Sequence, residues 1–148
     1  MARDPREPCA QCPFRRDVRP DICELKDSHP AEFIGQVFGP FLLPCHLDAG
    51  FVADARDPGN VQCPGAATFR TNVGVWARVE LPAALLRLPG DTDRYFATLE
   101  EFLAHHLRCS PEAAERWLRS YPPERLLDIE LRKRGVRVTV LGPAGGAS

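Results

Sequence analysis

Four of the six cysteines stand directly beside a proline, in short turn-forming segments, and this feature constrains the fold most. Cys9 and Cys12 form the motif C-x-x-C, Cys45 begins a Cys-His pair, and Cys63 begins Cys-Pro-Gly. A C-x-x-C turn directs two sulfurs at one tetrahedral metal centre about 2.3 Å away, and two further cysteines complete its shell. The pattern predicts a metal site formed by these four cysteines. Metal binding would offset the entropy of closing the loops between them.

The first seven residues lack the apolar stretch of a secretory signal, so we expect a cytoplasmic protein with reduced thiols. In that compartment, cysteines more often bind metals or take part in catalysis than form a disulfide framework. Two alternatives stay open: thiols without a structural role, and a redox dithiol at C-x-x-C. The dithiol requires a preceding strand and a helix start, and only eight residues precede Cys9.

Two further residues are reserve ligands. His46 follows Cys45, and imidazole binds zinc as well as thiolate does. Adjacent residues seldom reach one metal ion, so we favour Cys45. Cys23 lies in Asp-Ile-Cys-Glu-Leu. We predict that it is a small buried residue and keep it as a reserve ligand. His106 falls on the apolar side of a predicted helix, where we expect a hydrogen-bonded core histidine.

The hydrophobic spacing predicts a mainly α fold with a minor β component. We expect one domain over 1–141, in which a cysteine-rich half (8–75), stapled by the metal, packs on a helical half (76–141). A disordered tail is expected at 142–148. The predicted helices cover residues 30–38, 66–78, 81–88, 91–108, a segment starting at Pro111, and 123–134, and a short strand covers 136–140.

Charge and composition exclude several classes of protein. The net charge of −1 argues against a strongly basic nucleic-acid binder. The longest uncharged stretch, 33–47, is too short to cross a membrane and is interrupted by glycines and prolines. Arg15, Arg16 and Arg19 follow the C-x-x-C motif, but interleaved aspartates leave this patch weakly basic at most. Arg70 and Asn72, just beyond Cys63, are a candidate edge of the site.

The order C-x-x-C-P-F-R, then C-H, then C-P-G resembles an uncharacterised family of small bacterial and phage proteins. That family shows C-x-x-C-P-aromatic-R, a later Cys-His pair and a final C-x-G. The resemblance covers about residues 8–75, and it implies a metal site without implying an activity. The run Cys12-Pro13-Phe14-Arg15 also looks like the C-P-V-R of the WhiB-like iron–sulfur regulators, but the chain lacks their next cysteine and their glycine–tryptophan turn.

Three functions follow from these patterns. The first is a structural zinc site in a binding module whose partner is a protein or a nucleic acid. The second is an iron–sulfur cluster on the same four thiolates, serving electron transfer or redox sensing. The third is a metal-dependent enzyme using His46. The chain has no H-x-E or H-E-x-x-H motif that would supply a general base, so we do not favour the enzyme.

Overall fold

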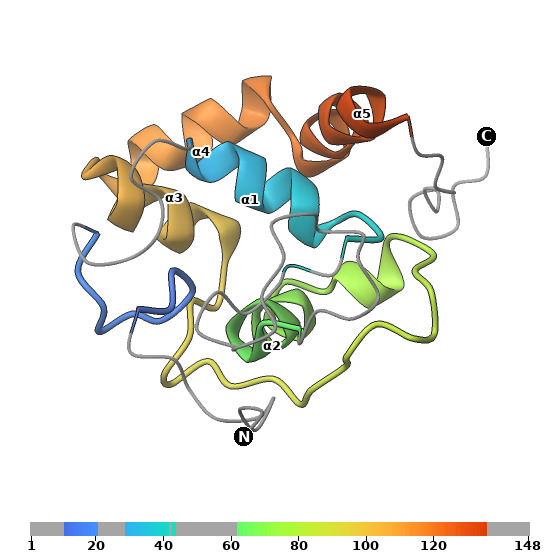
Figure 1. The fold of residues 1–148 in the computed structure, drawn as a ribbon. Helices are drawn as coiled ribbons and strands as arrows, with labels where there is room; N and C mark the ends of the chain where they lie inside the picture. Colours follow the sequence, from blue (N-terminus) through green and yellow to red (C-terminus); the bar gives the residue numbers. More distant parts are fainter. Residues whose placement is uncertain (1–10, 21–28, 42, 44–61, 136–148) are drawn as a thin grey trace.

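The computed structural model describes residues 11–20, 29–41, 43 and 62–135. Helices dominate this part of the chain, as Figure 1 shows, and the mainly α prediction is confirmed for it. An isolated antiparallel bridge joins Arg15 and Tyr95. The helices are α1 (Pro30–Val37), α2 (Pro64–Asn72), the 3₁₀ helix η1 (Val75–Ala77), α3 (Leu99–Leu107), α4 (Pro111–Ser120) and α5 (Pro123–Arg134).

Side-chain caps and prolines set the boundaries of several helices. The His29 ring accepts the Ala31 N–H at 3.1 Å at the start of α1, and the Ser110 hydroxyl caps α4 in the same way. α5 ends at Gly135, whose φ of 62° suits glycine. These contacts confirm the predicted helix over 30–38, the helix starting at Pro111 and the helix over 123–134 to within one residue.

The predicted helix over 91–108 begins eight residues late, at Leu99. The Asp91 carboxylate accepts the backbone N–H groups of Asp93 and Arg94, both at 3.1 Å, and closes a local turn instead of capping a helix. The Phe96 N–H then donates to the Phe14 carbonyl at 3.0 Å. Local and tertiary hydrogen bonds therefore replace the first two turns of the predicted helix.

Two other predictions for this region need correction. The helix expected over 66–78 is divided, because Gly74 adopts a φ of 74° between α2 and η1. The segment 81–88 is not helical. Leu85 donates to the Pro82 carbonyl in a turn, and the Gln62 side chain binds the backbone of Ala84. The predicted strand over 136–140 and the tail 142–148 lie outside the described residues.

The core lies where α1, at the centre of the fold, meets α2, α3 and α5 (Figure 1). Its middle is aromatic: the rings of Phe14, Phe69 and Phe102 lie 5.1 to 5.5 Å apart and are fully buried. Phe14 comes from the C-x-x-C-P-F-R motif, so the core itself fixes the position of that motif. Within the described residues, none of the helices combines the length and the apolar character needed to cross a membrane.

Candidate metal-binding site

Cys12 and Cys63, which are 51 positions apart in the sequence, come together at the start of α2. Cys63 occupies the N-cap position of α2, and Gly65 lies in the first turn of the helix. The Cys12 sulfur sits only 2.2 Å from the point where a Cβ on Gly65 would stand. No side chain fits there, which explains the glycine of Cys-Pro-Gly. The structure thus brings two of the four predicted ligands to one helix end.

The start of α2 suits negatively charged sulfur. Pro64 occupies the first helical position, where a missing N–H costs nothing. The N–H groups of Gly65 and Ala66 have no acceptor inside the helix, and they form the positive end of the helix dipole. Cys12 is 1% exposed and Cys63 is half-buried. Thiolates at this position would be electrostatically stabilised.

Tyr95 forms one wall beside the cysteine pair. Its ring carbon lies 3.5 Å from the same Gly65 Cβ position, and its side chain is buried. Burial, reinforced by the neighbouring Cys12, raises the pKa of Tyr95 to about 12, so the phenol is neutral. Tyr95 and Thr68 also line an open polar cavity of about 680 Å³, in which two arginines and two aspartates balance each other.

The other predicted ligands, Cys9, Cys45, His46 and Cys23, lie outside the described residues. Within the residues that the structure describes, no three histidine, cysteine, aspartate or glutamate side chains cluster as metal ligands do. The chain leading to Cys45 does reach the pair. The Leu43 carbonyl accepts the Cys63 N–H at 2.8 Å, two residues before Cys45.

Two histidines of α3 hold the segment that carries Cys12. His106 donates from its Nε2 to the Pro13 carbonyl at 2.6 Å, and the His105 Nε2 lies 2.7 Å from the Val18 carbonyl. Burial lowers the pKa of His106 to about 4, so its ring is neutral at physiological pH. The predicted role of His106 as a hydrogen-bonded core histidine is confirmed. The contact of His105 with the same segment was not predicted, because nothing in the sequence pairs position 105 with position 18.

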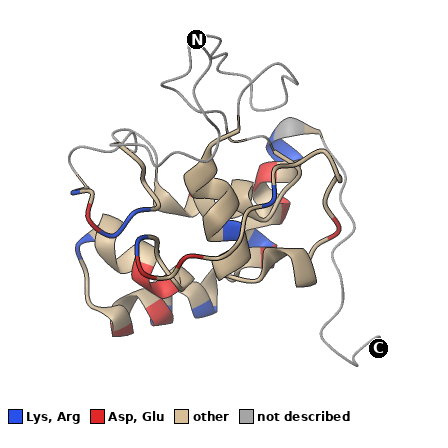
Figure 2. Ribbon diagram, turned by 90° about the horizontal axis from the view of Figure 1, so that it is seen from below, with Lys and Arg blue, Asp and Glu red and all other residues tan. Residues whose placement is uncertain are grey.

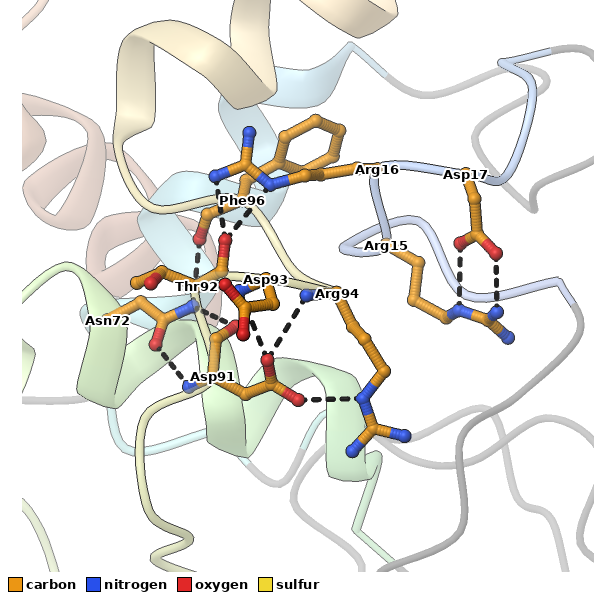
Figure 3. A network of polar contacts seen from close by, with 9 residues as sticks. All are labelled: Arg15, Arg16, Asp17, Asn72, Asp91, Thr92, Asp93, Arg94 and Phe96. Atoms are coloured by element: carbon orange, nitrogen blue, oxygen red, sulfur yellow. Dashed lines mark hydrogen bonds and ion pairs between the residues drawn. The ribbon is translucent and has the colours of Figure 1, made fainter.

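Arginines after the C-x-x-C motif tie it to the loop before α3 rather than forming a basic surface. Arg15 pairs with Asp17 at 2.7 Å, and Arg16 binds the Thr92 carbonyl and the Glu101 carboxylate, as Figure 3 shows in part. Figure 2 shows acidic and basic residues interspersed along the described ribbon. The prediction that this patch is weakly basic at most agrees with this arrangement.

Asn72 fixes the other side of the same loop. Its side chain accepts the Asp91 N–H at 2.8 Å and donates to the carbonyls of Asp91 and Phe96 at 3.0 and 2.9 Å (Figure 3). Asn72 braces α2 against the loop, and its role as an edge of the site stays a prediction. Cys109 lies away from these contacts, half-buried at the junction of α3 and α4.

Arg70 is the buried charge of this region, 1% exposed. Its guanidinium donates to the carbonyls of Val37 at 2.8 Å, Phe41 at 2.6 Å and Gly39 at 3.3 Å. Burial lowers the pKa of Arg70 to about 10, so it stays charged at neutral pH. The sequence indicated the position as polar, but its burial follows from contacts with a segment thirty residues earlier.

Comparisons with known proteins identify no relative. No protein family, curated protein or solved structure matches the chain. The resemblance to the family of small cysteine-rich proteins therefore stays a prediction, and function is argued from the site alone.

Proposed function

We propose that the chain is a metal-binding protein in which Cys9, Cys12, Cys45 and Cys63 hold one zinc ion. The observation that supports this most is the meeting of Cys12 and Cys63 at the positive end of α2, across 51 positions of sequence. Thiolates at a helix start, beside a glycine that admits a sulfur atom, form half of a tetrahedral shell.

The remaining two ligands are within covalent reach of the pair. Cys9 precedes Cys12 by three residues, and Cys45 follows Leu43 by two. An extended chain spans about 3.5 Å per residue, so these segments reach at most roughly 10 Å and 7 Å. Leu43, from which the chain continues toward Cys45, is itself hydrogen-bonded to Cys63.

A shell of four thiolates leaves no open position for water or substrate. The metal would then act on structure, by joining the C-x-x-C segment, the chain before Cys45 and α2. The protein would serve as a binding module, with another protein or a nucleic acid as its partner, in a reducing compartment such as the cytoplasm. His46 would stand next to a ligand without coordinating the metal.

Anaerobic purification, followed by an absorption spectrum and elemental analysis of one sample, tests the metal. We expect a colourless protein with one zinc per chain. Broad visible absorbance with iron and sulfide would replace zinc by an iron–sulfur cluster on the same thiolates. A metal-free protein that unfolds cooperatively and is not stabilised by added zinc or iron would refute the metal site.

Five single variants test the ligands. Cys12→Ser and Cys63→Ser should lose the metal, whereas Cys109→Ser should keep it, since Cys109 lies at the junction of α3 and α4. Loss of metal in His46→Ala but not in Cys45→Ser would show that the histidine is the ligand. Retention of full metal content in Cys63→Ser would contradict the proposed shell.

A further inference from the structure

Arg70 combines deep burial with an unusual set of partners. Its guanidinium binds carbonyls at the end of α1 and in the turn that follows: Gln36, Val37, Gly39 and Phe41. Among the described residues, no carboxylate pairs with it. Carbonyl dipoles at a helix C-terminus compensate a cation in part. A full positive charge is nevertheless retained inside the protein, where burial is costly.

The position of Arg70 on α2 directs that charge toward the cysteines. Arg70 follows Cys63 by seven residues, nearly two turns, so both lie on the same face of the helix, about 20° apart. Side chains on a helix lean toward its N-terminus, which is where Cys12 and Cys63 lie. An electrostatic interaction between Arg70 and the Cys63 thiol partly opposes the effect of burial on the pKa of Arg70.

The same residue also holds the chain that leads to Cys45. Arg70 binds the Phe41 carbonyl at 2.6 Å, and two residues later the Leu43 carbonyl accepts the Cys63 N–H. One arginine from α2 thus fixes the segment that runs from the end of α1 into the proposed site. Two residues of α2 or its N-cap therefore hydrogen-bond to this segment: Cys63 at the start of the helix and Arg70 in its interior.

We propose that Arg70 is a positioning residue of the cysteine site: it holds the chain that follows α1 beside Cys63 and supplies a buried positive charge to the thiolates. This inference rests on the proposed function. Four thiolates around Zn²⁺ carry a net charge of −2, and a nearby buried cation offsets part of it. The carbonyl contacts of Arg70 keep this charge in place, since a planar guanidinium donates in several fixed directions at once.

The test compares Arg70→Gln, which removes the charge, with Arg70→Lys, which keeps the charge but loses the fork. Leu118→Ala is the matched control, because it opens a cavity in the core under α4. α4 packs on α3, and α1 lies between α4 and α2 (Figure 1), so this cavity is remote from the cysteines. Zinc affinity is measured by competition with a chelator. In metal-free protein, amide hydrogen exchange gives the protection of the Cys63 N–H relative to that of Leu103 in the core.

We expect Arg70→Gln to bind zinc about 10- to 100-fold more weakly, the usual effect of removing a group that supports metal ligands. The Cys63-to-Leu103 protection ratio should fall as well. Arg70→Lys should lie between Arg70→Gln and the unmodified chain in affinity, and Leu118→Ala should change neither quantity while lowering stability. If Arg70→Gln does not fold, Arg70→Lys is judged by the same two measurements.

Unchanged zinc affinity together with an unchanged protection ratio in the Arg70 variant would overturn the inference. An equal loss of zinc affinity in Leu118→Ala would also overturn it, because Arg70 would then act through global stability alone. If the unmodified chain binds neither zinc nor iron, the proposed function fails. The exchange ratio in metal-free protein then decides separately whether Arg70 holds the segment against Cys63.

Discussion

Replacing Gly65 with alanine tests the geometry of the cysteine pair most directly. The added methyl group would stand 2.2 Å from the Cys12 sulfur. Non-bonded heavy atoms rest about 3.5 Å apart or more, so the sulfur or the helix must move by more than 1 Å, by this rough measure. Phe14 also lies 3.4 Å from the same point, and the buried aromatic core behind it limits how far the segment can retreat.

The expected cost follows from two opposing terms. Overpacking a well-filled site costs about 1–3 kcal/mol. Alanine in place of glycine within a helix recovers about 0.5–1 kcal/mol. We therefore expect Gly65→Ala to lower the free energy of unfolding by about 1–2 kcal/mol in metal-free protein. Zinc affinity should fall by at least about tenfold, because metal ligands tolerate displacements of only about 0.5 Å.

Urea unfolding and chelator competition measure the two effects. Gly35→Ala is the control: a methyl group there would meet the Leu126 carbonyl oxygen at 2.6 Å and the Glu130 Cγ at 2.7 Å, between α1 and α5. It should lose comparable stability and keep zinc. A Gly65→Ala protein with unchanged zinc affinity would refute the placement of Cys12 against α2. An equal affinity loss in Gly35→Ala would show that the metal responds to stability alone.

Three further predictions concern the residues that hold the site in place. The pKa of His106 falls from its usual 6.5 to about 4 in the folded chain, so its contribution to stability is complete above pH 6.5 and is lost as the pH falls toward 4. The shift corresponds to at most about 3 kcal/mol and, since the ring is partly exposed, to roughly 1–2 kcal/mol after screening. In urea unfolding between pH 7 and pH 4, His106→Gln should lose this part of the pH dependence of the free energy of unfolding. A pH dependence equal to that of the unmodified chain would contradict the prediction. Phe14→Ala should cost about 3–5 kcal/mol in the same assay, because its ring is buried against two other phenylalanines, and a loss below about 1 kcal/mol would count against that packing. Asn72→Ala removes three hydrogen bonds to the loop before α3, so we expect the free energy of unfolding to fall by about 2–3 kcal/mol and amide exchange at Asp91 to become faster. Unchanged protection of the Asp91 N–H would contradict this expectation.

Local signals predicted the fold well wherever the decisive contacts were also local. The proline at the start of α4 with its Ser110 cap, and Gly135 at the end of α5, mark helix ends through interactions within a few residues. The start of α3 was missed because Asp91 can cap a helix or close a turn with equal chemistry. What decides between them is the contact of Phe96 with Phe14, which is 82 positions away in the sequence.

The candidate site shows the same division. Cysteine spacing and the neighbouring prolines predicted Cys12 and Cys63 as ligands of one metal, and the structure places both at the start of α2. Arg70 was indicated only as a polar residue near the site. A buried arginine cannot be distinguished from a surface arginine by sequence pattern when its partners are backbone carbonyls, because carbonyls leave no signature in the amino-acid sequence.

The segment that carries Cys12 owes its shape to the helical half of the chain rather than to the cysteines alone. Phe14 is buried among Phe69 and Phe102, and the carbonyl of Pro13 is held by His106. The Phe96 N–H also donates to the Phe14 carbonyl. Of these four residues, Phe96 lies in the loop before α3, and Phe102 and His106 lie in α3 itself. A metal ion at the cysteines would therefore bind to a segment that the core has already placed. This preorganisation would reduce the entropy lost on metal binding, and it would couple the proposed metal to the stability of the helices.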